Sequence, residues 1–131
     1  TKEGKDGLWG YFHKDGSTMK EETWNKGRLM SITDFKDDDG DSHSSGTLKN
    51  GNGSVINYYA DGEVFSKGDY RNGLPNGEWE FFDEKGRKVT SGMLQDGVKE
   101  GAWEIYYKNG QLTGIEVYSN GVLIQSRSGM N

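Results

Sequence analysis

The sequence predicts an all-β protein, an array of antiparallel β-hairpin repeats with roughly ten strands in 131 residues. Glycine recurs at two fixed positions of a repeating unit that is a little over twenty residues long, and the residue before it is usually Asn or Asp. Between the glycines, aromatic residues alternate with polar ones. No window sustains the 3.6-residue apolar period of a helix.

The glycines form two classes, which mark the two turns of each repeat. The first class is almost evenly spaced and consists of Gly16, Gly40, Gly62, Gly86 and Gly110. The second class follows each of these at one constant interval, at Gly27, Gly51, Gly73, Gly97 and Gly121. Asn-Gly and Asp-Gly pairs supply the positive φ that two-residue hairpin turns need. Each repeat is therefore predicted to form two antiparallel strands.

These turns divide the chain, taken as a single repeat domain of residues 1–131, into five approximate repeats and a tail. The repeats cover residues 5–27, 28–51, 52–73, 74–97 and 98–121, and the tail covers 122–131. The second repeat is degenerate, because Thr33 replaces the Trp, Lys36 replaces an aromatic residue and residues 37–46 are polar. The apolar start of the tail suggests one further strand that protects an edge of the sheet.

Alternation along the strands assigns a core face, because side chains two residues apart share a face of a sheet. The positions seven residues before the first-class glycines hold Trp9, Thr33, Val55, Trp79 and Trp103. The positions five residues before hold Tyr11, Phe35, Asn57, Phe81 and Ile105, and those eight residues after hold Trp24, Leu48, Tyr70, Leu94 and Tyr118. Together they are predicted to form the continuous core that stacked repeats need.

The opposite face carries a second row of rings with carboxylates between them. Two interpretations remain open. The rings cover the sheet, or the sheet rolls up and buries both faces, since aromatic residues suit pleated surfaces. Alternatively, the row is a partner-binding strip, since aromatic residues are enriched at interfaces. The candidate partner-binding residues are Phe12, Tyr58, Phe82, Tyr106, Glu80 and Glu104.

Composition argues against most catalytic and metal chemistry, and we expect no cofactor. The chain has no Cys and two histidines, His13 and His43, which lack the spacing of a triad or a zinc site. The acidic run from Asp37 to Asp41 fits neither register of a calcium loop and is expected to be a solvated hairpin tip. Basic residues are scattered and the net charge is -5, which disfavours nucleic-acid binding.

The unit G-x-W-x-x-[YF]-[YF]-x-x-x-G, followed eleven residues later by [ND]-G, resembles the MORN repeat. It is most similar to the bacterial MORN variant of antitoxins of the YwqK family, from about Gly4 to Gly121 and best over Gly51 to Gly121. The resemblance implies an elongated, twisted antiparallel sheet of stacked hairpins, a protein-binding role and no catalytic residues. It also implies that the specific role is neutralising a co-encoded toxin.

Function is therefore predicted to be non-enzymatic protein binding, with an antitoxin or immunity role against a basic toxin as its specific form. A structural or envelope-associated spacer is the alternative, and lipid binding is disfavoured by the acidic balance. No apolar run reaches the ~18 residues of a membrane span, so a soluble protein is expected, and the resemblance implies a bacterial one. The chain begins at Thr1 without Met, which suggests a missing upstream segment and leaves export or lipoprotein anchoring, the compartment and the oligomeric state open.

Overall fold

The computed structural model describes residues 4–129, and strands account for all the regular structure in that range. Ten of the strands have five residues or more, the number predicted, but the degenerate repeat supplies only one of them and the tail supplies another, and β4, β5 and β8 are two-residue strands. The strands are β1 (Gly7–Phe12), β2 (Thr18–Asn25), β3 (Arg28–Ile32), β4 (Phe35–Lys36), β5 (Ser42–His43), β6 (Gly53–Tyr58), β7 (Val64–Arg71), β8 (Leu74–Pro75), β9 (Gly77–Phe82), β10 (Lys88–Gln95), β11 (Val98–Tyr106), β12 (Leu112–Ser119) and β13 (Val122–Ser128).

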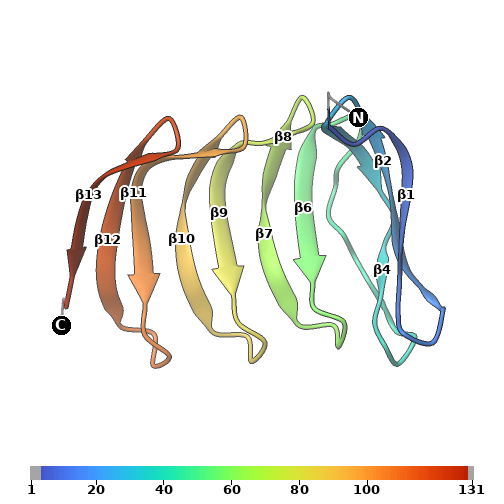
Figure 1. The fold of residues 1–131 in the computed structure, drawn as a ribbon. Coiled ribbons are helices and arrows are strands. Elements are labelled where there is room, and N and C mark those ends of the chain that lie inside the picture. The colour runs from blue at the N-terminus through green and yellow to red at the C-terminus, as the bar shows by residue number, and fades with distance from the viewer. Residues whose placement is uncertain (1–3, 130–131) are drawn as a thin grey trace.

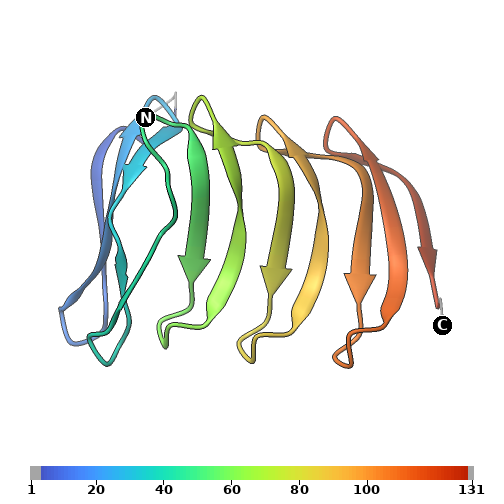
Figure 2. The same ribbon diagram turned by 180° about the vertical axis from the view of Figure 1, so that it is seen from behind.

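The all-β prediction is confirmed, and the strands follow one another in space nearly as they do in the chain. An eight-stranded antiparallel sheet has the order β13-β12-β11-β10-β9-β7-β6, with β8 paired to the end of β7. A three-stranded sheet, β1-β2-β3, lies beside it, and β4 and β5 form a small pair (Figure 1). The ends of the described chain lie at opposite ends of the array, as the rear view also shows (Figure 2).

Both classes of glycine lie in turns, as predicted, but only the second class has the predicted two-residue turn, and the first class lies in longer loops. In the second class the residue before the glycine also has positive φ, between 50° and 52° at Asn50, Asn72, Asp96 and Asn120. Two consecutive positive φ values define the hairpin turn whose twist matches that of the strands. The preference for Asn or Asp before Gly at this place therefore has a direct conformational cause.

Polar side chains tie three of these turns to the start of the repeat that each turn closes. The backbone N–H of Asn72 donates to Asn52 Oδ1 at 3.0 Å, and the N–H of Asn120 donates to Glu100 Oε2 at 2.8 Å. Turn glycines add backbone bonds of the same kind, such as Gly97 N–H to the Pro75 carbonyl at 2.9 Å. The two ends of each of these repeats are thus joined by hydrogen bonds as well as by packing.

The core lies on the predicted face. Val55, Trp79 and Trp103 are buried, with Trp103 fully inaccessible. The Trp79 ring lies against Gly68 and the Trp103 ring against Gly92, where a Cβ would overlap the indole. Each indole N–H donates to a carbonyl of the same neighbouring strand, Trp79 to Asp69 and Trp103 to Met93. Partly buried residues packed against this core include the predicted Trp24, Leu48, Tyr70, Phe81, Leu94 and Tyr118.

Some core predictions for the N-terminal half are wrong. Trp9 is 41% exposed and Thr33 is exposed, whereas Leu29, which we did not predict, is buried with Val55 in the core. Trp9 lies on β1, which pairs only with β2 and so forms the outer edge of the three-stranded sheet. Its ring therefore lacks the flanking repeat that buries Trp79 and Trp103.

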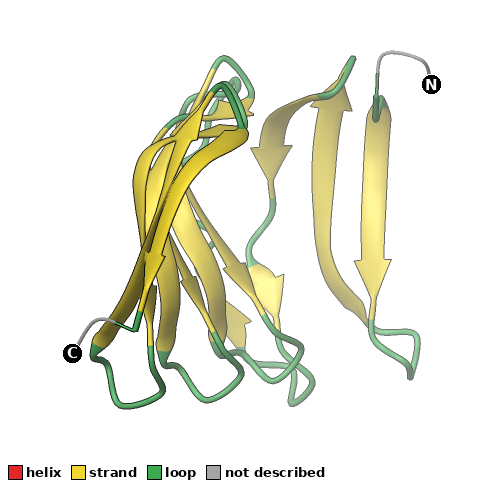
Figure 3. Cartoon of the chain, turned by 60° about the vertical axis from the view of Figure 1, so that its left-hand side comes forward, coloured by secondary structure: helices red, strands yellow, loops and turns green. Residues whose placement is uncertain are grey.

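The degenerate repeat interrupts the sheet. Figure 3 shows the three-stranded sheet beside the curved larger one. At this junction the buried Phe35 packs its ring on Tyr58, with centroids 5.2 Å apart, and edge-on to His13 at 6.2 Å. His13 also hydrogen-bonds the Lys36 carbonyl through Nε2 at 2.8 Å. The polar second repeat thus builds a small aromatic cluster of its own in place of a regular hairpin.

Asp37 organises the acidic hairpin tip of that repeat. Its Oδ1 accepts the N–H groups of Asp39 and Asp41, both at 2.9 Å, and its Oδ2 lies 2.8 Å from His43 Nε2. The hydrogen bond from His43, followed by the backbone bond from Asp41, holds the pKa of Asp37 below its usual value. Carboxylate oxygens of Asp37, Asp38 and Asp39 lie within 4.8 Å of one another, and these bonds within the loop account for the position of Asp37.

We expect Asp37→Asn to lower the urea midpoint of unfolding at neutral pH. A carboxyl whose folded pKa is depressed stabilises the fold fully above its unfolded pKa, about 3.9, and loses that contribution as pH falls through the folded value. The variant lacks the contribution at every pH, so its difference from the parent chain should be largest above about pH 4 and vanish in stronger acid. Urea titrations by circular dichroism across this range test it; a pH-independent difference would contradict it.

Candidate functional site

A strip of rings and charges runs across β7, β9, β10 and β11 on the face opposite the two buried indoles. At its centre Glu80 pairs across the sheet with Lys67, with 3.9 Å between Nζ and Oε1. Lys88 approaches the other oxygen of Glu80 at 3.5 Å. The predicted carboxylate therefore already has two lysine partners within the chain. Because these pairs are partly exposed, each contributes little to stability.

The same lysines lie over the rings of the strip. Lys67 Nζ is 5.6 Å from the centre of the Phe82 ring, and Lys88 Nζ is 4.8 Å from that of Tyr106. Both rings are half-buried. Glu104 completes the strip as an exposed residue whose backbone carbonyl accepts the Thr90 hydroxyl at 2.8 Å. We call this set the ring strip: Lys67, Glu80, Phe82, Lys88, Glu104 and Tyr106.

The structure does not bring the other two predicted rings to the ring strip. Phe12 is 61% exposed but belongs to β1, in the three-stranded sheet. Tyr58 stacks on Phe35, and its hydroxyl donates to the Ser44 carbonyl at 2.6 Å. Tyr58 is therefore part of the junction with the degenerate repeat, and its ring supports the fold. Of the predicted set, Phe82, Tyr106, Glu80 and Glu104 lie together.

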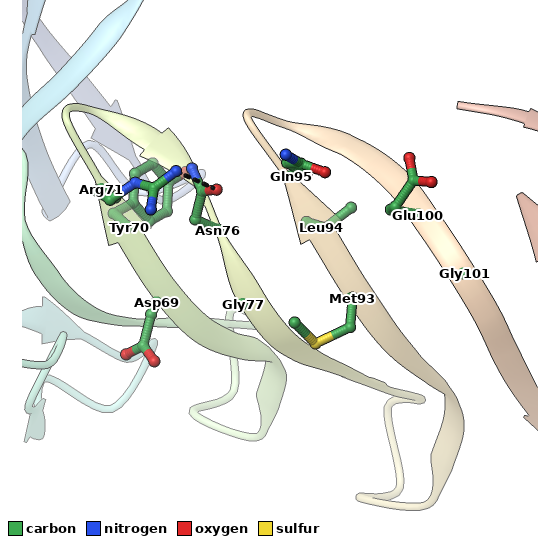
Figure 4. Close-up of a pocket in the computed structure, with 10 residues that line it drawn as sticks. All are labelled: Asp69, Tyr70, Arg71, Asn76, Gly77, Met93, Leu94, Gln95, Glu100 and Gly101. Atoms are coloured by element: carbon green, nitrogen blue, oxygen red, sulfur yellow. Dashed lines mark hydrogen bonds between the residues drawn. The ribbon is translucent and has the colours of Figure 1, made fainter. Parts of the chain in front are cut away.

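A shallow groove of about 680 Å³ lies on the same face, toward the second-class turns. Asp69 is two residues from Lys67, so its side chain lies on the face of the ring strip. Met93 lies on that face as well, because it pairs with Glu78, which is two residues from Glu80. Figure 4 shows the residues that line the groove, where the Arg71 guanidinium donates a hydrogen bond to Asn76 Oδ1 at 3.4 Å. The residues that line the groove are Asp69, Tyr70, Arg71, Asn76, Gly77, Met93, Leu94, Gln95, Glu100 and Gly101.

The groove offers contact surface rather than acid–base chemistry. Burial raises the pKa of Tyr70 to about 12, and the charge of Glu22 adds to the effect, so this phenol stays protonated at neutral pH. Met93 is 46% exposed and supplies an adaptable apolar contact. Both histidines lie elsewhere, in the contacts around Phe35. Among the described residues the face thus combines rings, one thioether and mixed charges, which suits recognition of another polypeptide.

Sequence reasoning missed two parts of this face. The lysine partners of Glu80 come from strands on either side of it, and the strand register that aligns them is shifted by bulges. In β7, for example, Asn57 pairs with Ser66 and Tyr58 with Val64, which leaves Phe65 unpaired. The groove could have been anticipated in part, because Gly77 and Gly101 recur with the spacing of the repeat and remove side chains at its rim.

Comparison with known proteins identifies the repeat type in two segments. Residues 51–72 and 99–120 each match the family model described as MORN repeat variant. No curated protein and no solved structure matches the chain significantly. The matched segments run from one second-class turn to the next and include the hairpins β6–β7 and β11–β12. They support a repeat module, in agreement with the resemblance noted in the sequence.

Proposed function

We propose that this chain is a non-enzymatic protein-binding module whose contact surface is the ring strip together with the adjoining groove. One observation carries the proposal, namely that half-buried rings, a groove and charged side chains occupy one face of a rigid sheet. Sites built on strands hold their side chains more firmly than sites on loops. The two segments similar to MORN repeats support a binding or scaffold role.

The partner that fits this face best is a basic protein. Carboxylates outnumber basic groups there, with Asp69, Glu78, Glu80, Glu100 and Glu104 against Lys67, Arg71 and Lys88. The net charge of the chain is also negative, at -5. Opposite charge steers association and fixes orientation more than it adds affinity. Neutralisation of a basic toxin, as an antitoxin or immunity protein does, is the specific form of this role that we propose.

The test begins with capture of a partner from lysate of the source cell and continues with calorimetry on the purified pair. We expect Phe82→Ser combined with Tyr106→Ser to weaken binding at least about tenfold, because buried aromatic anchors carry most interface energy. Raising the salt concentration should weaken it further. Tyr58 is left unchanged, since its contacts with Phe35 support the fold.

Phe12→Ser is the matched control, because it removes a ring that lies on the other sheet and that, at 61%, is more exposed than the half-buried Phe82 and Tyr106. Its affinity should equal that of the parent chain. Equal weakening by the control and the double variant would contradict the assigned surface. A chain that captures no protein, or only envelope material, would favour the spacer role instead.

A further inference from the structure

The ammonium group of Lys5 lies inside a cage of three aromatic rings at the N-terminal end of the array. Its Nζ is 4.8 Å from the centre of the Trp24 ring, 5.0 Å from that of Trp9 and 5.7 Å from that of Tyr11. A cation within about 6 Å of a ring face is attracted by the ring quadrupole. Three rings around one nitrogen are the arrangement by which proteins recognise organic ammonium groups.

A buried carboxylate holds two walls of this cage in place. Glu22 is 6% exposed, and its Oε1 accepts both the Tyr11 hydroxyl and the Trp24 indole N–H at 2.9 Å. Lys20 Nζ lies 2.9 Å from its other oxygen. Burial raises the pKa of Glu22, but the hydrogen bonds and charge of Lys20 and the bonds from the two rings outweigh that effect, and the pKa is lowered. The Glu22 carboxylate is therefore ionised at neutral pH and holds the Tyr11 and Trp24 rings in position.

The same lysine recurs where no open cage exists. Lys99 stands four residues before Trp103, as Lys5 does before Trp9, and its Nζ lies 4.9 Å from the rings of both Trp103 and Tyr118. In that repeat Ile105 replaces the third ring, and Trp103 is fully buried. The N-terminal copy differs in having Tyr11 and a Trp9 that is 41% exposed.

Lys5 can leave the cage without moving the chain. Its backbone lies outside β1, and its carbonyl accepts the Gly27 N–H at 2.7 Å, so the main chain is fixed independently of the side chain. The ammonium itself is held by the rings and by a hydrogen bond to the Tyr11 hydroxyl at 3.0 Å. Because the Tyr11 oxygen accepts this bond, the cage favours an ammonium that still carries N–H groups.

We propose that Trp9, Tyr11 and Trp24 form a binding site for a primary alkylammonium group, such as the side chain of a lysine on another protein, and that Lys5 occupies this site until such a ligand displaces it. The site lies outside the ring strip and the groove. It therefore adds a second recognition element to the chain and does not depend on the proposed function.

The experiment removes the built-in occupant and supplies a small one. Lys5→Ala is titrated with n-butylammonium up to about 100 mM at constant ionic strength, because an isolated ammonium group binds only in the millimolar range. Indole N–H resonances, assigned by single Trp substitutions, report the site. We expect saturable shifts of Trp9 and Trp24 but not of Trp79, and at least about tenfold weaker binding in the parent chain, where the tethered Lys5 competes.

Three arms make the result specific. The uncharged 1-butanol should cause no saturable shift, choline should bind more weakly than n-butylammonium, and adding Trp9→Leu to Lys5→Ala should abolish the response. Lys99→Ala is the matched control and should gain no site. Lys5→Ser replaces Lys5→Ala if the latter fails to fold. Equal shifts with 1-butanol, the absence of saturation or an unchanged response after Trp9→Leu would overturn the site. Tighter binding of choline would overturn its assignment to primary ammonium groups.

Discussion

Gly92→Ala is expected to destabilise the protein by about 3 kcal/mol, although it adds only one methyl group to a strand. The cause is the Trp103 indole, which lies on the Gly92 backbone where the new Cβ would be. Trp103 is fully buried, so the ring cannot shift without leaving its contacts and its hydrogen bond to the Met93 carbonyl. Urea unfolding followed by circular dichroism measures the loss.

Gly10→Ala is the control for strand glycines in general. Its Cβ would meet only the tip of the exposed Phe12 ring, at 3.1 Å, and that ring can move. Because alanine also lowers the entropy of the unfolded chain, we expect a change within about 1 kcal/mol of zero. Similar losses for the two variants would show that the indole contact is not the cause.

Trp103→Ala is expected to cost about 3 to 5 kcal/mol, the usual range for a large buried ring. The two residues form one contact, so their effects should not add. In the Trp103→Ala background, Gly92→Ala should cost less than about 1 kcal/mol, because the added methyl then occupies part of the cavity left by the ring. The full double-mutant cycle is measured by the same urea titrations, and additive losses would contradict this coupling.

The column that contains Gly92 shows what the sequence already encodes about stacking. Six residues after the first-class glycines stand Glu22, Gly46, Gly68, Gly92 and Glu116. Eleven residues after Gly68 stands Trp79, and eleven residues after Gly92 stands Trp103. The column holds glutamate, at Glu22 and Glu116, where the residue eleven positions later is not Trp but Thr33 or Arg127. We predicted the tryptophans as core, but the glycines beneath them required knowledge of which strands are neighbours.

Regular spacing predicts the turns and the core face well, because both depend on local conformation and on period-two alternation. It fails where the partner of a side chain lies on another strand. Tyr58 has the spacing of a surface ring, yet the irregular second repeat places Phe35 against it. Glu80 has the spacing of a free carboxylate, yet Lys67 and Lys88 converge on it from the flanking strands. Partner binding at the ring strip stays a prediction.

The order of the strands also bears on how quickly this chain finds its fold. Almost every strand of the larger sheet pairs with its neighbour in the sequence, and only the short β8 intervenes between β7 and β9. Closing such short loops costs little entropy, and proteins with a low contact order fold fast. An all-β protein of this topology should therefore fold with the kinetics of a protein rich in local contacts, with any of its hairpins able to serve as the nucleus from which the array grows.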